Sequence, residues 1–316
     1  MRIGIDAMGG DFAPTEAIAG AIEAVKLHPK IELVLFGNEA LISSQVTDYA
    51  KNITVVPSSN DIGMSEHPVK ALLGKPNSSI ALGFGYLAQG KIDGFLSAGN
   101  TGAMLVGSVN VLKPIDGVLR PCITSIIPRE NKNPGVLLDV GANADVKPEH
   151  LVQFARLGSI YYQTIYGHAA KVGLLNIGEE EEKGNVLAKA THKLLKETKG
   201  IDFVGNIEGR SLFTEDADVI VCDGFTGNAI IKVCEGMFYT LAKRGVKDEF
   251  LDKFNFKHYG GAPVLGINSP VIVGHGISKS STFVKMIEMT MTTIEQKMVE
   301  KMKLAFQSSE ANSTTA

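Results

Sequence analysis

Arg2-Ile-Gly-Ile-Asp-Ala-Met-Gly-Gly-Asp11 is the stretch that decides the fold. Its first half, Arg2–Asp6, is an apolar run of strand length, and a glycine-rich turn follows at once. Pro14 suits the first turn of a helix. The helix it opens has an apolar stripe at i, i+3, i+4 and i+7, formed by Ile18, Ala21, Ile22 and Val25. A strand, a turn and a helix are therefore predicted within the first thirty or so residues.

The same alternation continues along the chain. Further strands are predicted at Ile31–Phe36, Ile53–Pro57, Ile92–Ser97, Val136–Val140, Val172–Asn176, Phe203–Asn206 and Val219–Cys222. Helices between them are predicted at Glu149–Tyr166, Asn185–Lys199 and Ile230–Lys243. Strands that are apolar throughout, with helices between them, are typical of a parallel sheet covered on both faces. The sequence predicts an α/β protein, a three-layer α/β/α sandwich with a Rossmann-like, mostly parallel sheet.

Some segments depart from this alternation. Pro128-Arg-Glu-Asn-Lys-Asn-Pro134 is too short for a crossover helix, so Ile123–Ile127 and Val136–Val140 are predicted to form a hairpin. The sequence has no linker that would divide it, so we expect one domain over residues 1–306. Within it, a short segment of helix and loop is predicted at about 244–266, and its last part, Tyr259–Gly266, is predicted to be a loop. A long final helix is predicted from about Ser280 to Phe306, before a disordered polar tail at 307–316.

The composition excludes several classes of protein. The 316 residues include 44% hydrophobic and 21% charged residues, as in ordinary globular proteins. The net charge of −3 argues against a nucleic-acid partner. No apolar run reaches the length of a membrane-spanning helix, and no signal peptide is evident. Because the three cysteines have no paired spacing, we expect reduced thiols in a cytoplasmic protein.

Glycine-rich turns follow four of the predicted strands. They are Asp6-Ala-Met-Gly-Gly-Asp11, Ser97-Ala-Gly-Asn-Thr-Gly-Ala103, Asp139-Val-Gly-Ala-Asn143 and Asp223-Gly-Phe-Thr-Gly-Asn228. Ligands of open α/β sheets bind beyond the carboxyl ends of the strands, and amides at a helix N-terminus favour phosphate. The turns therefore indicate an anion site, with tight strand-to-helix connections as the simpler alternative.

The usual nucleotide and nucleophile motifs are absent. The sequence contains no G-x-x-x-x-G-K-[ST], no G-x-G-x-x-G after the first strand and no G-x-S-x-G. Cys222 ends a predicted buried strand, which favours a core position over a catalytic one. His67 and His275 lie in predicted loops, where surface or structural roles are favoured. If the protein is an enzyme, we expect no covalent intermediate and no nucleotide cofactor.

Asn176-Ile-Gly-Glu-Glu-Glu-Glu-Lys-Gly-Asn185 follows another predicted strand directly. The four glutamates are consistent with a solvated helix start, which the helix dipole favours. Lys183 lies between them and Gly184, at the sheet edge predicted for the glycine turns. Its ammonium could neutralise a phosphate or a developing oxyanion.

Aspartates begin three of the glycine turns. Asp6, Asp139 and Asp223 stand at predicted strand ends, where a carboxylate can accept hydrogen bonds from the backbone of the turn. We favour this capping role over two alternatives, orientation of Lys183 and metal binding.

Taken in order, these blocks resemble the bacterial phosphate acyltransferase family (PlsX). The resemblance runs from Met1 to about Gly276. Besides the four turns, it is carried by Leu138-Asp-Val-Gly-Ala-Asn143, Lys147-Pro-Glu-His150, Lys183-Gly-Asn185 and Tyr259-Gly-Gly-Ala262.

The resemblance implies an activity. Members of the family transfer a fatty acyl group from acyl carrier protein to inorganic phosphate, and a membrane glycerol-3-phosphate acyltransferase uses the acyl phosphate in phospholipid synthesis. They are homodimers, require no metal, and resemble isopropylmalate dehydrogenases and phosphotransacetylases in fold. The family's catalytic residues correspond to Lys183 and Asn228. For phosphate and substrate binding we expect Gly99, Asn100, Thr101, Gly102, Asp139, Asn143, Gly224, Thr226 and Gly227.

The chain departs from the family pattern between Asn228 and Tyr259. Many members carry a longer pair of apolar helices there, thought to touch the membrane. This chain has instead a short segment in which Phe250, Leu251, Phe254 and Phe256 alternate with Lys247, Lys253 and Lys257. Such a segment suits a peripheral membrane contact, docking of the acidic carrier, or a helix that packs its Phe side inward.

Two other functions stay open. A phosphotransacetylase-like enzyme acting on short acyl-CoA would use similar turns. A non-catalytic scaffold that recruits lipid enzymes is a third reading, against which the intact Lys183 and Asn228 argue.

Overall fold

The computed structural model describes residues 1–46, 51–130, 133–214, 216–255 and 258–313, with side chains up to residue 307. It divides into two compact units. Unit 1 comprises Met1–Pro114 and Lys257–Val299, and unit 2 comprises Ile115–Phe256 and Glu300–Ala316. A single domain was expected over residues 1–306, because the sequence contains no linker at which these two units could have been recognised.

The sheet of unit 1 has the strand order β3-β2-β1-β4-β11-β10. Its strands are β1 (Arg2–Asp6), β2 (Glu32–Gly37), β3 (Ile53–Pro57), β4 (Gly94–Ser97), β10 (Gly261–Leu265) and β11 (Val271–Gly274). All neighbours pair in parallel except β10 and β11, which are antiparallel. Strands β1 to β4 were predicted, whereas β11 was not, and β10 lies in a segment for which a loop was predicted.

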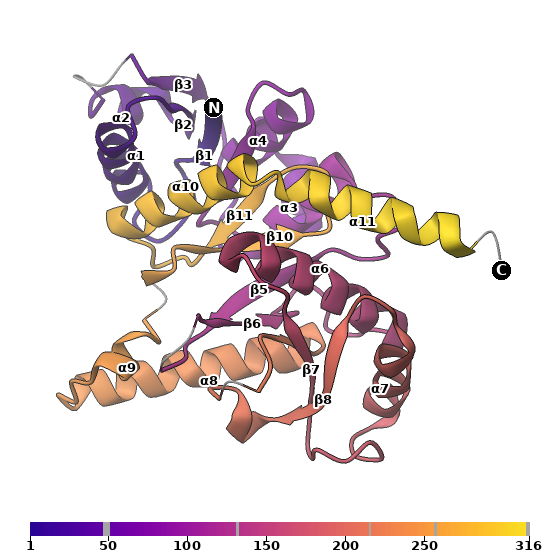
Figure 1. Cartoon of the computed structure of the whole chain (residues 1–316). Coiled ribbons are helices and arrows are strands. Elements are labelled where there is room, and N and C mark those ends of the chain that lie inside the picture. Colours follow the sequence, from indigo (N-terminus) through magenta and orange to yellow (C-terminus); the bar gives the residue numbers. More distant parts are fainter. Residues whose placement is uncertain (47–50, 131–132, 215, 256–257, 314–316) are drawn as a thin grey trace. The chain divides into compact units, whose positions relative to one another are not determined.

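Helices cover both faces of this sheet. The helices of unit 1 are α1 (Thr15–Leu27), α2 (Glu39–Ser43), α3 (Pro68–Gly74), α4 (Ser79–Ala88), α5 (Thr101–Gly107) with a π-helical extension (Ser108–Leu112), and α10 (Ser280–Glu295). Alternate residues of β1 and β2 pack with α1 and α10, which lie side by side (Figure 1). The opposite face has Phe84 of α4 edge-on to Phe95 of β4, at 5.3 Å between centroids.

The sheet of unit 2 has the order β5-β6-β9-β7-β8. Its strands are β5 (Cys122–Ile127), β6 (Gly135–Leu138), β7 (Lys171–Asn176), β8 (Asp202–Glu208) and β9 (Val219–Val221). Strands β5 and β6 form the predicted antiparallel hairpin, whereas β6, β9, β7 and β8 are parallel to one another. The carboxyl ends of these four strands therefore lie at one edge of the sheet.

Helices again lie on both faces. Unit 2 contains α6 (Pro148–Tyr166), α7 (Val186–Glu197), a 3₁₀ turn (Gly209–Ser211), α8 (Gly224–Lys243) and α9 (Glu249–Asp252). On one face, Gly158 of α6 packs on Leu138 and Val219, so closely that a Cβ there would lie 2.7 Å from Val219. On the other face, Ile230 and Ile231 of α8 pack on the cluster that includes Leu137 and Ile220. Each unit is thus a three-layer α/β/α sandwich, as predicted.

The C-terminal helix differs from its prediction. Helix α10 ends at Glu295, and α11 (Met298–Ser313) begins after Lys297, whose φ is +52°. The expected single helix from Ser280 to Phe306 is therefore broken. Residues 307–313, which we expected in a disordered tail, belong to α11, and 314–316 lie outside the described residues. Among the described residues, no helix combines the length and the apolar character needed to span a membrane.

Candidate active site

The four glycine turns lie as two neighbouring pairs, one pair in each unit. In unit 1, the turn from Asp6 follows β1 and the turn from Ser97 follows β4, its parallel neighbour. In unit 2, the turn from Asp139 follows β6 and the segment from Asp223 follows β9, again a parallel neighbour. Within each unit, the pair stands at the carboxyl edge of the sheet, where ligands of such sheets bind.

A buried aspartate organises the pair in unit 1. The Ser97 hydroxyl donates to Asp6 Oδ2 at 2.6 Å, and the Met8 amide donates to Asp6 Oδ1 at 3.0 Å. The Gly99 amide in turn donates to Ser97 Oγ at 2.9 Å. Burial raises the pKa of Asp6, while its hydrogen bonds with Ser79, Ser97 and Met8 act in the opposite direction. The Met8 contact is the predicted capping role, and the Ser97 contact, which was not predicted, ties the two turns together.

Asn100 caps helix α5 and holds a neighbouring loop. Its Oδ1 accepts from the Ala103 amide, while Nδ2 lies within hydrogen-bonding distance of the carbonyls of Gly63, Met64 and Glu66. The buried side chain is therefore fully engaged with protein groups. The exposed Thr101 and half-buried Gly102 begin α5, and their amides have no acceptor in the described part of the chain.

A second buried aspartate, Asp139, organises the pair in unit 2. Its Oδ1 accepts from the amides of Ile123 (3.0 Å) and Ala142 (3.2 Å), and its Oδ2 accepts from the Asn143 amide (2.6 Å) and from Asn143 Nδ2 (2.9 Å). Burial raises the pKa of Asp139, and these hydrogen bonds oppose that shift. Asn143 Nδ2 also donates to the Pro121 carbonyl at 2.8 Å.

The segment from Asp223 is the beginning of α8 rather than a turn. Asp223 is the N-cap: its carboxylate accepts from the Thr226 amide at 2.8 Å and from the Thr226 hydroxyl at 2.7 Å. Its capping role is therefore confirmed. The expected helix start at Ile230 is wrong, because the cap and two glycines allow the helix to begin at Gly224.

These glycines let α8 approach the Asp139 turn closely. The Gly224 amide donates to the Asn143 carbonyl at 2.8 Å, and a Cβ on Gly224 would lie 2.7 Å from Asp139 Oδ2. A Cβ on Gly227 would lie 2.0 Å from the Asp139 carbonyl oxygen, so any other residue there would force α8 or the Asp139 turn to shift. Asn228 is exposed and faces Gly141, where an added Cβ would stand 3.8 Å from Asn228 Oδ1.

Most amides that we expected to cradle a phosphate already have protein acceptors. This is the case for Gly99, Asn143, Gly224, Thr226 and Gly227. The turns consequently serve first as a framework that fixes the strand ends. Side chains displayed from that framework are the groups left to contact a ligand.

Lys183 is such a group. It follows β7, which neighbours β9 in parallel, so Lys183 and Asn228 belong to connections that leave the same edge of one sheet. Its side chain is exposed, and among the described residues its ammonium has no partner. Its backbone is fixed instead: the amide donates to the Glu180 carbonyl at 3.0 Å, and the carbonyl accepts from Asn176 Nδ2 at 3.1 Å.

Two of the three cysteines of this unit, Cys122 and Cys222, are buried and therefore unavailable as nucleophiles. Cys222 is buried in the core cluster beside Ile220, and its thiol lies 3.6 Å from the Asp139 carbonyl oxygen. Burial raises the pKa of both Cys222 and Cys122 well above 9.0. The core position predicted for Cys222 is confirmed. No cluster of three or more potential metal ligands occurs in the ranges that the structure describes.

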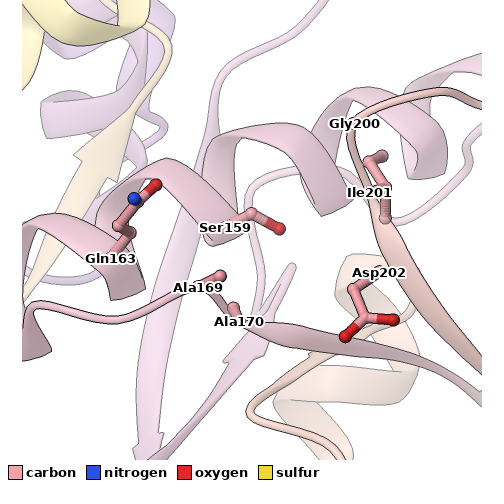
Figure 2. Close-up of a pocket in the computed structure, with 7 residues that line it drawn as sticks. All are labelled: Ser159, Gln163, Ala169, Ala170, Gly200, Ile201 and Asp202. Atoms are coloured by element: carbon pink, nitrogen blue, oxygen red, sulfur yellow. The ribbon is translucent and has the colours of Figure 1, made fainter.

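A pocket of unit 2 lies away from Lys183. It has a volume of about 360 Å³ and lies between α6 and the segments that lead into β7 and β8 (Figure 2). Its lining residues are Ser159, Gln163, Ala169, Ala170, Gly200, Ile201 and Asp202. Because it lies at the amino ends of β7 and β8, it is at the opposite edge from Lys183.

The short aromatic segment packs at least partly inward. Phe250, Leu251 and Phe254 are half-buried, and the Phe254 ring lies edge-on to Phe213 at 5.1 Å between centroids. Lys253 donates to the Arg129 carbonyl at 2.9 Å. Phe256 and Lys257 lie outside the described residues.

Comparison with known proteins decides the family. The model of the family described as "Fatty acid synthesis protein" matches residues 1–301. The chain belongs to this family. Relatives named "Phosphate acyltransferase" are 40% identical over 332 residues in Clostridium botulinum (97% of this chain, 99% of the relative) and 40% identical over 335 residues in Salinibacter ruber (98% and 99%). These relatives are acyltransferases, and the family is one of enzymes.

Solved structures agree on the fold. A phosphotransacetylase from Streptococcus pyogenes matches with a TM-score of 0.66 at 16% identity, covering 94% of each chain. A branched-chain phosphotransacylase from Enterococcus faecalis matches with a TM-score of 0.62 at 13% identity, covering 93% of this chain and 99% of that one. These likenesses confirm the predicted phosphotransacetylase-like fold.

Sequence reasoning missed two polar residues near Lys183. Asn206, within β8, donates to the Glu180 carbonyl at 2.8 Å, and His192 of α7 lies 3.0 Å from Asn206 Oδ1. The only sequence feature that pointed to Asn206 was its position as the single polar side chain at the end of the predicted strand Phe203–Asn206. Its partners, however, are set by strand pairing that sequence spacing does not reveal.

Proposed function

We propose that this protein transfers a fatty acyl group from acyl carrier protein to inorganic phosphate and releases acyl phosphate and free carrier. The observation that carries the proposal is Lys183, an exposed ammonium on a fixed backbone, at the same sheet edge as Asn228. A free cation on a rigid turn suits a substrate that arrives as a small dianion. The relatives named phosphate acyltransferase support the same substrate.

Phosphate must be held close to the thioester in order to react. It is strongly hydrated, and fixing both reactants in one site can lower the barrier by about 7–11 kcal/mol. In our proposal Lys183 binds the phosphate dianion. The anion-binding role expected for the unengaged amides of Thr101 and Gly102, which belong to unit 1, stays a separate prediction. Asp139, Asn143, Gly224 and Gly227 then act through the framework that carries Asn228.

Phosphate oxygen attacks the carbonyl carbon of the thioester, a C–O bond forms, and the carbonyl oxygen becomes an oxyanion. In our proposal Asn228, an exposed amide on the first turns of α8, donates to that oxyanion. Such a donor typically contributes about 10²–10³ in rate. When the C–S bond breaks, the carrier leaves as a thiolate and takes up a proton from solvent.

The transfer is direct in this proposal. Cys122 and Cys222 are buried, and burial raises the pKa of both thiols, so neither would supply a thiolate at neutral pH. A thiolate leaving group needs little proton assistance, because thiols are more acidic than alcohols. A Ser–His or Cys–His pair is therefore not required.

The proposal also covers the location, the oligomeric state and the metabolic role of the enzyme. We place the enzyme in the cytoplasm as a homodimer, with a peripheral location at the inner face of the membrane. Its acyl phosphate would supply a membrane glycerol-3-phosphate acyltransferase in phospholipid synthesis. The half-buried Phe250 and Phe254 support inward packing of the short segment more than membrane contact.

One specific observation favours a second candidate. The fold likeness to phosphotransacetylases suggests an enzyme that acts on short acyl-CoA. Such an enzyme would transfer acetyl groups between coenzyme A and phosphate with the same Lys183.

A thioester-consumption assay tests the proposal and separates it from the alternative. Palmitoyl carrier protein and acetyl-CoA are each incubated with the enzyme, with and without phosphate, while thiol release and acyl phosphate are measured. We expect equal amounts of both products from palmitoyl carrier protein, and only with phosphate. If acetyl-CoA is consumed and palmitoyl carrier protein is not, the second candidate is supported. If neither thioester is consumed, the protein is a non-catalytic scaffold.

A further inference from the structure

The turn that carries Lys183 is held from the side of β7 by Asn176. Its Nδ2 donates to the Lys183 carbonyl at 3.1 Å, and its Oδ1 accepts from the Ile177 amide at 2.8 Å. Gly184 has a φ of +92°, and a Cβ there would lie 2.3 Å from Asn176 Oδ1. The carbonyl side of Lys183 is therefore fixed by an asparagine and by a glycine that lets it approach.

The amide side of Lys183 is held through the Glu180 carbonyl. That oxygen accepts from the Lys183 amide at 3.0 Å and from Asn206 Nδ2 at 2.8 Å. Asn206 is only 5% exposed and lies on β8, where it pairs in register with Leu174 of β7. A buried side chain of the sheet thus reaches up to the loop and fixes the carbonyl that Lys183 depends on.

His192 orients the Asn206 amide. Its Nδ1 lies 3.0 Å from Asn206 Oδ1, and the ring is 6% exposed. Because Asn206 uses its NH₂ group for Glu180, its oxygen faces His192, so the imidazole must carry a proton on Nδ1. The ring itself is held edge-on to Phe203, with 5.0 Å between centroids.

The exposed Glu181 side chain contacts both His192 and Lys196 of α7. Its Oε1 lies 3.8 Å from His192 Nε2 and forms an ion pair with Lys196 of α7. The residues before Lys183 are therefore anchored to β8 and α7 by both main-chain and side-chain contacts.

We infer that Asn206 and His192 are positioning residues for catalysis by Lys183. They act through the Glu180 carbonyl and fix the direction in which the lysine leaves the sheet edge. This inference rests on the proposed function of Lys183. Its physical basis is that a displacement of about 1 Å in a catalytic group can cost on the order of 10²-fold in rate.

Asn206→Leu tests this inference, because leucine has a similar volume but can neither donate to Glu180 nor accept from His192. We expect kcat/KM for phosphate to fall on the order of tenfold or more, with KM for palmitoyl carrier protein unchanged. His192→Leu should give the same pattern. His192→Asn, whose amide nitrogen can replace Nδ1, should recover most of the loss.

Thr191→Val is the matched control. Thr191 is fully buried, neighbours His192 in α7, and donates only to the Leu187 carbonyl of its own helix, at 2.8 Å. It loses a buried hydrogen bond without touching the Lys183 turn, so its kcat and both KM values should match those of the wild type. Thermal midpoints of all variants are measured in parallel.

A double-mutant cycle completes the test. In a Lys183→Ala background, Asn206→Leu should cause no further loss of activity, because the residue it positions is gone. An equal loss in both backgrounds, or a loss matched by Thr191→Val, would assign Asn206 and His192 to stability alone. Should Asn206→Leu fail to fold, the His192→Leu and His192→Asn pair decides the same question. Full activity of Lys183→Ala itself would instead overturn the proposed function.

Discussion

The two turn pairs, one in each unit, are built on the same plan but display different chemistry. In unit 1, Asp6 is buried and joins the turns after β1 and β4 through Ser97. In unit 2, Asp139 is buried and joins the turn after β6 to the first turn of α8 through Asn143 and Gly224. In both, the glycines allow backbones to approach and the aspartate satisfies the amides.

The pairs differ in the side chains that they leave exposed. The asparagine of the unit 1 pair, Asn100, is buried and engaged with several carbonyls. The unit 2 pair also has a buried, engaged asparagine, Asn143, but its second asparagine, Asn228, is exposed, and the neighbouring strand β7 leads to the exposed Lys183. Glycine turns thus provide a framework, and reactivity depends on the polar side chains mounted on it.

The largest effect is expected from removing the cation of unit 2. Lys183→Ala should lower the rate of acyl phosphate formation by about 10²–10³-fold, because the charge that would hold phosphate is lost. Lys189→Ala removes another exposed cation, on helix α7, and serves as the control. Steady-state assays on both variants check this, and similar rates for the two would remove Lys183 from the mechanism.

The next largest effect concerns the contact that joins α8 to the Asp139 turn. Gly227→Ala places a Cβ 2.0 Å from the Asp139 carbonyl oxygen, so the helix must shift, at a cost of about 3 kcal/mol in the free energy of unfolding. Gly236→Ala, in the same helix with nothing within 4 Å of its Cβ, should instead stabilise by about 0.5–1 kcal/mol. Urea denaturation measures both variants, and equal midpoints would contradict the close approach.

A smaller effect is expected for the engaged asparagine of unit 1. Asn100→Ala removes a helix cap and buried hydrogen bonds, which should cost about 2 kcal/mol of stability. Asn38→Ala, which loses only the exposed cap of α2, should cost about 1 kcal/mol. Thermal unfolding of the two variants distinguishes them. Equal losses would show that the carbonyl contacts of Asn100 contribute nothing.

The smallest and most gradual effect concerns pH. Burial raises the pKa of Asp139 above its usual 3.8, so the folded state retains a proton that the unfolded state has already lost. Relative to Asp139→Asn, the free energy of unfolding of the wild type should fall as pH rises from about 3.8 and level off above the folded pKa. Asp6→Asn should give the same sign, since burial also raises the pKa of Asp6. Urea titrations across this range measure the difference, and a rise with pH would contradict the shift.

Local patterns were sufficient for much of the fold. The apolar run at Arg2–Asp6 and the stripe through Ile18 and Val25 predicted β1 and α1, because both form their own periodic signal. Strands β10 and β11 were missed, since Gly261-Ala-Pro263 has the composition of a loop. Its strand character comes from pairing, with Gly261 opposite Gly274 and Pro263 opposite Ile272.

The candidate site was predictable only in part. Strand ends and glycines located the capping aspartates, and the segment after Val172–Asn176 drew attention to Lys183. The role of Asn206 could not be predicted, because its contact with Glu180 depends on the register of β7 and β8. The hydrogen bonds of Asn100 could not be predicted either, because their acceptors lie in the loop at 63–66, whose position the sequence does not reveal.

Direct attack of phosphate on the thioester is the central claim of this account, and a single-turnover experiment tests it most directly. The enzyme is mixed with equimolar palmitoyl carrier protein in phosphate-free buffer, thiol release and intact protein mass are recorded, and phosphate is then added. We predict no thiol and no mass increase before the addition, followed by one equivalent each of thiol and acyl phosphate. Thiol release with a palmitoyl adduct on the protein before phosphate is added would contradict the claim.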